Sequence, residues 1–477
     1  MKIQKNFKLQ LILALLLIVA VAVRMWNLET TSRFLWDESS DLVRMQEIWE
    51  SKKLTLIGPI SEGGDKVFSS LTYYMLLPAA IAGGFDLLSP VYASVFWGLL
   101  TIILFAVLLH KRKLDNFRFI CGALLLVVWL PLVQTSRWAW NPNLIPFWVV
   151  LSLLLIKGKK LHWKFLAGLS MGMTIHHHYL SAFMIVIFVL SLSFHKIKNR
   201  IQSIAPFVVG VLFAITPFVV FDLTHPPGLF ISRILYFNFL GLEGSIPLWL
   251  KIRNIYIDFF KYVSGREIAA IVIFIFTSAL AYIDVKTREI RSIRTGITWV
   301  LYLLALSIVG VVYTHYFLPV IVFYLLWVLE KRDAKYSWLS KLLLVVITIS
   351  SLIALPRILT EGNWESNTKN TKAITSIIEN EITKQALINA NIVVLASDDP
   401  NIYGRKFRDL MQLHKEVTLK SKDEYYISDN LFVITIADEE RVRNDPAVEM
   451  DGFRRGIMKE VWVIGDSDWK VYRFDRY

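Results

Sequence analysis

The sequence predicts a mainly α-helical, polytopic membrane protein with a small α/β domain at its C-terminus. Three observations predict this class. Of the 477 residues, 55 % are hydrophobic and only 19 % are charged, whereas soluble domains carry about 25 % charged residues. Apolar runs near the length of about 20 residues that crosses a hydrocarbon core recur through residues 1–355. Residues 356–477 are polar and mildly acidic instead, so we expect a membrane domain at 1–355 and an extracytoplasmic domain at 356–477.

Eleven membrane spans are expected, and the basic residues between them predict their orientation. The spans are 8–26, 90–110, 118–136, 142–156, 164–177, 179–194, 203–222, 266–284, 296–314, 316–330 and 338–355. The sequence contains six clusters of Lys and Arg. Their first residues are Lys2, Lys111, Lys157, Lys196, Lys286 and Lys331. Such clusters are typical of cytoplasmic loops. If all six are cytoplasmic, the N-terminus is inside the cell and the C-terminal domain is outside the cell (inner) membrane. The first apolar run has no small-residue cleavage pattern, so we expect it to be a retained anchor.

Residues 67–84 are apolar, but we do not expect them to cross the membrane. A span here would place the basic cluster at 111–113 outside the cell and invert every later loop. The segment also contains Pro78 and ends in two glycines. We therefore expect a helix that lies in the outer interface, and a similar helix over residues 41–52. The first extracytoplasmic loop then covers residues 27–89, and a further outer loop covers 223–265.

The C-terminal region alternates between helical and strand-like patterns. We expect helices over 371–388 and 404–415, and strands over 391–397, 431–437, 461–465 and 469–474. Neither a G-x-G-x-x-G nor a Walker A sequence is present there. The composition also disfavours other classes of protein. The single cysteine, Cys121, forms no internal disulfide, and basic residues confined to short clusters between apolar runs predict membrane lipids and not nucleic acid as partners.

Two adjacent carboxylates, Asp37 and Glu38, follow the first span in the run R-F-L-W-D-E-S-S-D. A carboxylate beside an apolar surface can act as general base for an acceptor hydroxyl or amine. The more ordinary interpretation is that the pair is a solvated feature of a polar loop. Both interpretations stay open on the sequence chemistry alone.

Further polar residues fall at the expected outer level of the membrane. Candidate ligands of a donor phosphate or substrate are Lys66, Arg137, Asn141, His178 and His315. Arg137 either binds a lipid phosphate or snorkels beside the aromatic residues around it. Three consecutive histidines at 176–178 cannot all face one metal ion from a helix and match no zinc spacing. We therefore assign no metal site and no cofactor, although a divalent metal ion remains possible.

The order of these features resembles the GT-C glycosyltransferases. A basic N-terminus and one span precede W-D-E in the first outer loop, and R-W-A-W-N-P-N, a segment ending in His178-Tyr179 and Y-T-H-Y-F-L-P follow. Within that group the chain is similar to the bacterial protein O-mannosyltransferase-like and lipid A aminoarabinose transferase-like enzymes. The resemblance covers residues 1–355. The family's first-loop histidine has no match before Tyr73, and Lys66 could stand in for its cation.

The resemblance implies an inverting hexosyl- or pentosyltransferase of the cell envelope. The donor would be a sugar on a polyprenyl phosphate, and the acceptor a protein, a lipid or a glycan. Asp37 matches the family's base and Glu38 its second acidic residue. Two alternatives remain open: oligosaccharyl or O-antigen transfer from a pyrophosphate-linked donor, and a flippase or transporter of lipid-linked sugars. A transporter should show internal repeats and polar residues near the midplane of the membrane, and a non-catalytic scaffold would not explain the acidic loop.

Overall fold

A computed structural model describes residues 2–60, 67–192, 197–232, 246–330, 332–333, 335–361, 367–395, 402–414, 417–465 and 467–477. The chain divides into two compact units. The first comprises residues 1–26, 55–76 and 92–358, and the second comprises 27–54, 77–91 and 359–477. Two segments of the first outer loop therefore group with the C-terminal region, a division that differs from the boundary expected at residue 355.

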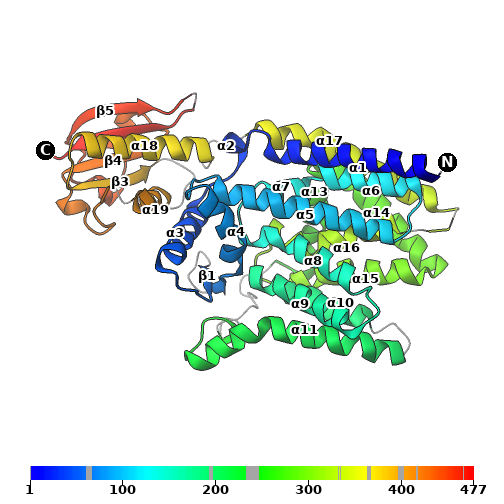
Figure 1. Cartoon of the computed structure of the whole chain (residues 1–477). Coiled ribbons are helices and arrows are strands. Elements are labelled where there is room, and N and C mark those ends of the chain that lie inside the picture. The colour runs from blue at the N-terminus through cyan, green and yellow to red at the C-terminus, as the bar shows by residue number, and fades with distance from the viewer. Residues whose placement is uncertain are drawn as a thin grey trace. The chain divides into compact units, whose positions relative to one another are not determined.

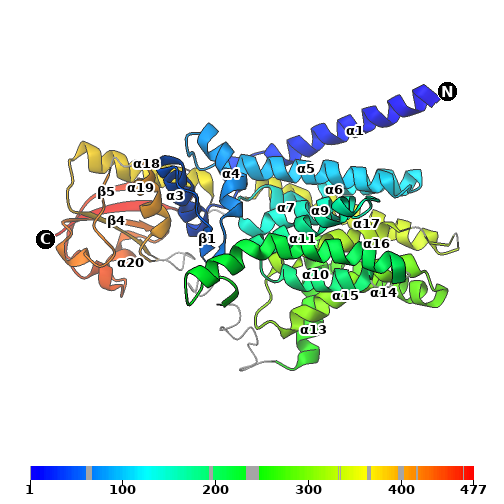
Figure 2. The ribbon, with the colours of Figure 1, turned by 60° about the horizontal axis from the view of Figure 1, so that its bottom comes forward.

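The first unit is a bundle of helices (Figures 1 and 2). Its helices are α1 (Lys2–Met25), α5 (Ser89–Lys111), α6 (Asn116–Val128), α7 (Leu130–Ser136), α8 (Ile145–Leu155), α9 (Leu161–His177), α10 (Ser181–Leu192), α11 (Ile197–Thr224), α13 (Leu248–Ser264), α14 (Glu267–Thr287), α15 (Ile290–Ala305), α16 (Leu318–Leu329) and α17 (Ser337–Thr360). The short 3₁₀ turns η1 (Asn141–Leu144), η2 (Leu306–Ile308) and η3 (Thr314–Phe317) connect several of them. Each of the eleven expected spans contains a helix, which confirms a polytopic helical fold.

Within the described residues, five stretches are long and apolar enough to cross a membrane: Ser89–Lys111, Asn116–Ser136, Ile204–Thr224, Glu267–Thr287 and Ser337–Thr360. The other apolar helices are shorter, and many of them are buried by their neighbours. Every residue of α16 is buried, for example. A helix that is apolar on all sides fits such a central position in the bundle.

The expected outer loop at 223–265 contains a helix that the sequence interpretation missed. α13 (Leu248–Ser264) is amphipathic, and its buried residues include Ile255, Phe259 and Val263. These three residues are four apart and lie on one helix face. The Phe259 ring packs against Phe317, at 5.5 Å between ring centroids, and against Tyr324, at 5.3 Å. The charged residues between these positions concealed the helix in the sequence.

Small residues allow α9 and α11 to pack with their backbones in contact. A Cβ atom on Gly168 would lie 1.8 Å from the carbonyl oxygen of Phe207, and one on Gly210 would lie 2.1 Å from that of Phe165. Only glycine fits at such positions, as in other close helix pairs of membrane proteins. The contact fixes the position of α9, the helix that ends at the three histidines.

The expected interfacial helix over 67–84 is only partly right. Residues Val67–Ser69 form β2, which pairs antiparallel with β1 (Ile57–Ile60). The helix α4 begins later, at Leu71, and ends at Ala82 with Pro78 inside it. Pairing with β1 satisfies the backbone N–H and C=O groups of residues 67–69 that a helix would otherwise use.

The second unit contains the α/β domain expected at the C-terminus. Its sheet has the order β3-β4-β6-β5, in which β3 (Ala390–Leu395) and β4 (Asn430–Thr435) are parallel and β6 (Lys470–Asp475) is antiparallel to both β4 and β5 (Ile457–Val463). α18 (Thr368–Lys384) and α19 (Arg405–His414) cover one face, where they pack against Phe432 and Ile434 of β4. The opposite face is covered in part by α20 (Glu439–Arg443). The predicted helices and strands of this region are confirmed. The short α2 (Leu28–Thr31) and α3 (Trp36–Ser51), from the first outer loop, complete the unit.

Candidate active site

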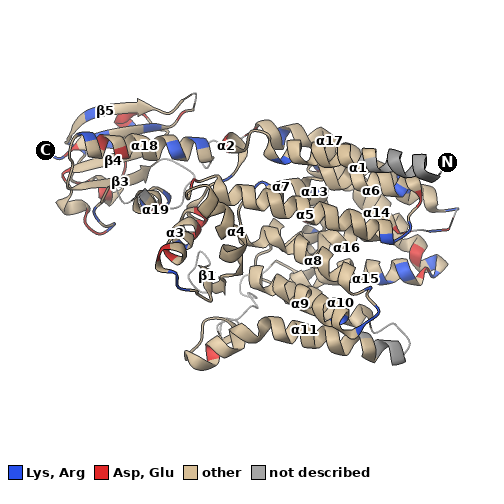
Figure 3. Ribbon diagram, in the orientation of Figure 1, with Lys and Arg blue, Asp and Glu red and all other residues tan. Residues whose placement is uncertain are grey.

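The two candidate catalytic carboxylates lie in the first turn of α3. The side chain of Glu38 is buried and its Oε2 accepts a hydrogen bond of 2.6 Å from the backbone N–H of Leu35. Asp37 is half-buried. The free N–H groups and the dipole of a helix N-terminus favour negative charge there. Both carboxylates therefore lie where the helix terminus offers N–H groups to an acceptor. The red segments of α3 mark its acidic residues in Figure 3.

The C-terminal domain holds the start of α3 through α19. Ser39 and Ser40 each donate a hydrogen bond to Oδ2 of Asp409, at 2.8 and 2.7 Å. The Arg405 guanidinium lies 5.0 Å from the ring centroid of Trp36. One turn of α19 therefore contacts Trp36, which precedes the Asp-Glu pair, and the two serines that follow it.

Burial raises the pKa of the Asp409 carboxyl, although the hydrogen bonds from Ser40 and Ser39 and the nearby Arg405 act in the opposite direction. A carboxylate so placed is the acceptor that both serine hydroxyls share. No sequence signal points to this contact, because residues 39 and 409 are separated by most of the chain. The W-D-E-S-S run only shows that two hydroxyls directly follow the acidic pair.

A second group of candidate residues lies in the first unit, in what we call the imidazole cluster: Phe68, Trp140, His178, His315 and Tyr316. The rings of His178 and His315 are 5.2 Å apart, and the Tyr316 ring lies 4.8 Å from His178. Trp140 packs edge-on against His315 at 4.5 Å. The structure therefore brings together His178 and His315, which are far apart in the sequence.

The two histidines before His178 have structural hydrogen bonds on both ring nitrogens. Trp148 Nε1, which can only donate, lies 3.0 Å from Nε2 of His177, so Nδ1 of this neutral ring donates to Thr72 Oγ1 at 3.0 Å. His176 lies between Ser69 Oγ and the carbonyl oxygen of Ala214, each at 2.8 Å. Of the three consecutive histidines, only His178 belongs to the imidazole cluster.

Asn141 and Arg137 support the same end of the bundle through backbone contacts. The Asn141 side-chain amide donates to the carbonyl oxygen of His177 at 2.9 Å, which fixes the chain just before His178. The Arg137 guanidinium donates to the carbonyl oxygens of Val23, at 2.8 Å, and Trp26, at 2.8 Å. Arg137 thereby satisfies carbonyls at the C-terminal end of α1, a role that the sequence did not reveal.

Two further expectations concern Lys66 and metal ions. Lys66 lies outside the described residues. Within the described part of the chain, no group of three or more His, Cys, Asp and Glu side chains has a geometry that could hold a metal ion.

Comparison with known proteins identifies the fold. No protein-family model and no curated protein sequence matches the chain. The structure of ArnT from Cupriavidus metallidurans in the apo state superimposes with a TM-score of 0.61 and 11 % identity, covering 99 % of this chain and 98 % of ArnT. ArnT bound to undecaprenyl phosphate gives a TM-score of 0.61 and 12 % identity over 98 % of each chain. An oligosaccharyltransferase from Archaeoglobus fulgidus in complex with Zn and sulfate gives a TM-score of 0.49 and 13 % identity over 94 % of this chain and 71 % of its own.

The architecture is therefore that of the GT-C membrane proteins, with an N-terminal bundle and a small C-terminal sheet domain. More narrowly, it is the ArnT-like form of this fold, because the match to ArnT covers nearly the whole of both chains. The fold that the sequence resemblance implied is confirmed.

Proposed function

We propose that the chain is an inverting glycosyltransferase that moves a sugar from a polyprenyl-phosphate-linked donor to a protein, lipid or glycan acceptor at the outer face of the cell membrane. The observation that carries this proposal is the fold shared with ArnT along 98 % or more of both chains, including the ArnT structure with undecaprenyl phosphate bound. The position of Asp37 and Glu38 in the first turn of α3 supports it.

Asp37 is the proposed general base. Its carboxylate takes the proton from the acceptor hydroxyl or amine while the acceptor atom attacks the anomeric carbon of the sugar. The bond between that carbon and the phosphate oxygen breaks on the opposite side, so the configuration inverts and polyprenyl phosphate leaves. The buried Glu38, which accepts a hydrogen bond from Leu35 N–H, holds the first turn in place beside Asp37.

The imidazole cluster is the proposed site for the donor. Negative charge develops on the phosphate oxygen as the glycosidic bond breaks, and N–H donors aimed at that oxygen lower the barrier. His178 and His315 supply such donors, and Asn141 positions the chain that carries His178. Lys66 is a further proposed cation for the phosphate. Arg137, whose guanidinium donates to carbonyl oxygens of α1 and of the turn that follows it, acts in this proposal by holding that end of the bundle.

The experiment compares wild type, Asp37→Asn and a matched control in liposomes loaded with labelled polyprenyl-phosphate sugar and an envelope extract. Glu47→Gln is the control, because Glu47 is an exposed carboxylate of the same helix that pairs with Arg44 at 2.6 Å. Loss of a general base typically slows a reaction by about 10²–10⁴-fold. We expect this loss for Asp37→Asn and full transfer by Glu47→Gln.

Further arms of the experiment separate the alternatives. Equal transfer by wild type and a folded Asp37→Asn would rule out Asp37 as the base. Transfer only from a pyrophosphate-linked donor would identify the oligosaccharyl-type reaction. Movement of labelled lipid between leaflets without any transfer would replace the transferase with a transporter.

A further inference from the structure

A basic pocket of about 630 Å³ lies where α5, α8, α10 and α16 end and α15 begins. We call it the basic pocket. Six cations line it: Lys111, Arg112, Lys113, Lys157, Arg291 and Arg294. Figure 3 shows Lys and Arg at the end of the bundle where α1 begins, whereas the imidazole cluster follows the C-terminal end of α9. With a rise of about 1.5 Å per residue, the 17 residues of α9 separate the two ends by roughly 25 Å.

The lining of the basic pocket has a large excess of positive charge. Among the described lining residues the one carboxylate is Glu330, and it forms an ion pair with Arg112. Partial burial lowers the pKa of Lys157 to about 8, and repulsion from Arg112, Lys111 and Arg291 contributes, against an opposing effect of Glu330. An anion among these side chains would relieve the repulsion between them.

The pocket differs from an ordinary run of cytoplasmic basic residues. Lys159 and Lys160 follow in the same loop as Lys157 but do not line the pocket. Such residues are sufficient for the positive-inside bias. The lining also has an apolar wall formed by Leu153, Phe188, Phe323 and Leu326. Cations above an apolar wall match a ligand with an anionic group and a less polar remainder.

We propose that the basic pocket binds a phosphate group, carried either by the headgroup of an anionic lipid or by a small organic phosphate. Arg and Lys are the side chains that recognise phosphate, Arg through paired N–H donors and Lys as a point charge. The binding does not depend on the transfer reaction proposed above, and it takes place at the end of the bundle remote from the imidazole cluster.

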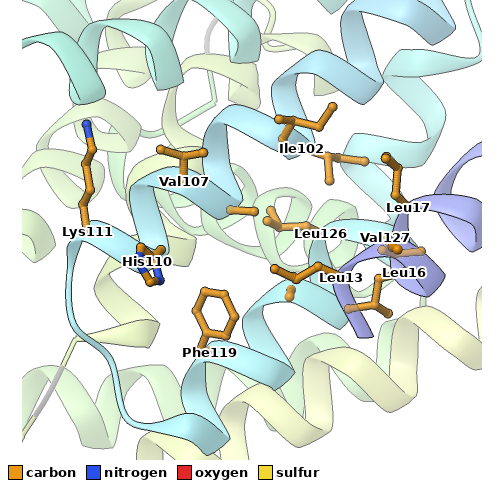
Figure 4. Close-up of a pocket in the computed structure, with 14 residues that line it drawn as sticks. Leu13, Leu16, Leu17, Ile102, Val107, His110, Lys111, Phe119, Leu126 and Val127 are labelled. Carbon is orange, nitrogen blue, oxygen red and sulfur yellow. The ribbon is translucent and has the colours of Figure 1, made fainter. Parts of the chain in front are cut away.

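A neighbouring groove favours the lipid as the source of the phosphate. The groove, of about 600 Å³, runs between α1, α5 and α6 and is lined by apolar side chains such as Leu13, Leu17 and Ile102 (Figure 4). Its lining ends in His110 and Lys111, and Lys111 also lines the basic pocket. A lipid whose phosphate contacts Lys111 thus has an apolar surface for an acyl chain directly beside it.

The test measures binding to the purified full-length chain by native mass spectrometry and by thermal unfolding in detergent. The probes are phosphatidylglycerol, net-neutral phosphatidylcholine and free glycerol 3-phosphate. Lys157→Gln/Arg291→Gln removes two cations of the pocket. Lys159→Gln/Lys286→Gln removes the same charge from the loop after α8 and from the last turn of α14 without changing the lining.

We expect phosphatidylglycerol to bind wild type and the control variant, and to bind Lys157→Gln/Arg291→Gln about tenfold or more weakly, a factor that corresponds to about 1.4 kcal/mol. If glycerol 3-phosphate binds as tightly as phosphatidylglycerol with the same dependence on the pocket, the source is a free phosphate. Equal binding by all three proteins, or no preference for either anionic probe over phosphatidylcholine, would overturn the proposal. Lys157→Arg/Arg291→Lys keeps both charges and should bind as wild type does. Weak binding by this variant too would show that substitution at these two positions disturbs the fold and that charge is not what the Gln variant has lost.

Discussion

At the scale of single residues, Asp37 and Glu38 are neighbours with different proposed tasks. Glu38 accepts the hydrogen bond from Leu35 N–H at the start of α3. We expect Glu38→Ala to lower stability by about 0.5–2 kcal/mol, the cost of losing a helix cap, and to lower transfer as well. Asp37→Asn should abolish transfer with an unchanged unfolding midpoint. The measurements are thermal unfolding and sugar transfer for both variants, and equal unfolding midpoints for Glu38→Ala and wild type would remove the capping role.

A buried ion pair in the bundle allows a second prediction at this scale. Arg332 Nε donates to Asp284 Oδ1 at 2.7 Å, and Trp327 Nε1 donates to Oδ2 at 2.9 Å. Removing one partner of a buried pair typically costs about 3–5 kcal/mol, because the other charge is left uncompensated. Asp284→Ala should therefore lower the unfolding midpoint strongly, and adding Arg332→Met should restore part of it. A double variant as unstable as the single one would contradict this explanation.

At the scale of elements, the contact between α3 and α19 predicts a dependence on pH. The raised pKa of Asp409 means that the folded chain binds a proton more tightly than the unfolded chain, in which the pKa is near its ordinary value of 3.8. The contribution of Asp409 to stability is therefore greatest below that value and falls as the pH rises through the folded-state pKa. Asp409→Asn should flatten this part of the profile of unfolding midpoint against pH.

The control for this prediction is Asp423→Asn, since Asp423 is an exposed carboxylate of the same domain. Its profile should match wild type. Ser39→Ala/Ser40→Ala removes both donors to Asp409 and should increase hydrogen exchange in the first turns of α3. A wild-type profile in Asp409→Asn would show that the carboxyl does not titrate differently in the two states.

The packing of α9 on α11 gives a further prediction at the scale of elements. A Cβ atom at Gly168 would lie 1.8 Å from Phe207 O, so Gly168→Val must push the two helices apart. We expect a loss of about 1–3 kcal/mol or more, as for other overpacked interiors. Gly84→Ala is not a suitable control because its φ of +61° is itself unfavourable for alanine; Ser191→Ala, at the end of α10, is suitable. An unchanged unfolding midpoint in Gly168→Val would show that the helices can separate at no cost.

The sequence predicted the elements better than their contacts. Long apolar runs and alternating strands have a strong local signal, so the eleven helices and the C-terminal sheet could be predicted. α13 was missed because charged residues interrupt its apolar face. The contacts from Ser39 and Ser40 to Asp409, and the pairing of His178 with His315, could not be predicted, because they join segments whose approach depends on the whole fold.

At the scale of the whole molecule, the chain passes between its two compact units several times. The segments 27–54 and 77–91 group with 359–477, whereas 55–76 groups with the bundle. Segments 27–54 and 77–91 are thus part of the same compact unit as the C-terminal domain and not free connections. The proposed base on α3 therefore depends on a domain that begins more than 300 residues later, which gives that domain a positioning role in the proposed reaction.

The orientation in the membrane is the last property that the whole molecule predicts. Cys121 is the single cysteine, so a Cys121→Ser background accepts one new cysteine at a time. Lys159→Cys lies in an exposed loop at the basic end of the bundle, and Tyr426→Cys in the C-terminal domain, where the Tyr426 side chain is 74 % exposed. Because basic loops are retained in the cytoplasm, an impermeant maleimide should label Tyr426→Cys in intact spheroplasts and Lys159→Cys only after permeabilisation. The reverse pattern would place Asp37 and the C-terminal domain on the cytoplasmic side and exclude transfer at the outer face.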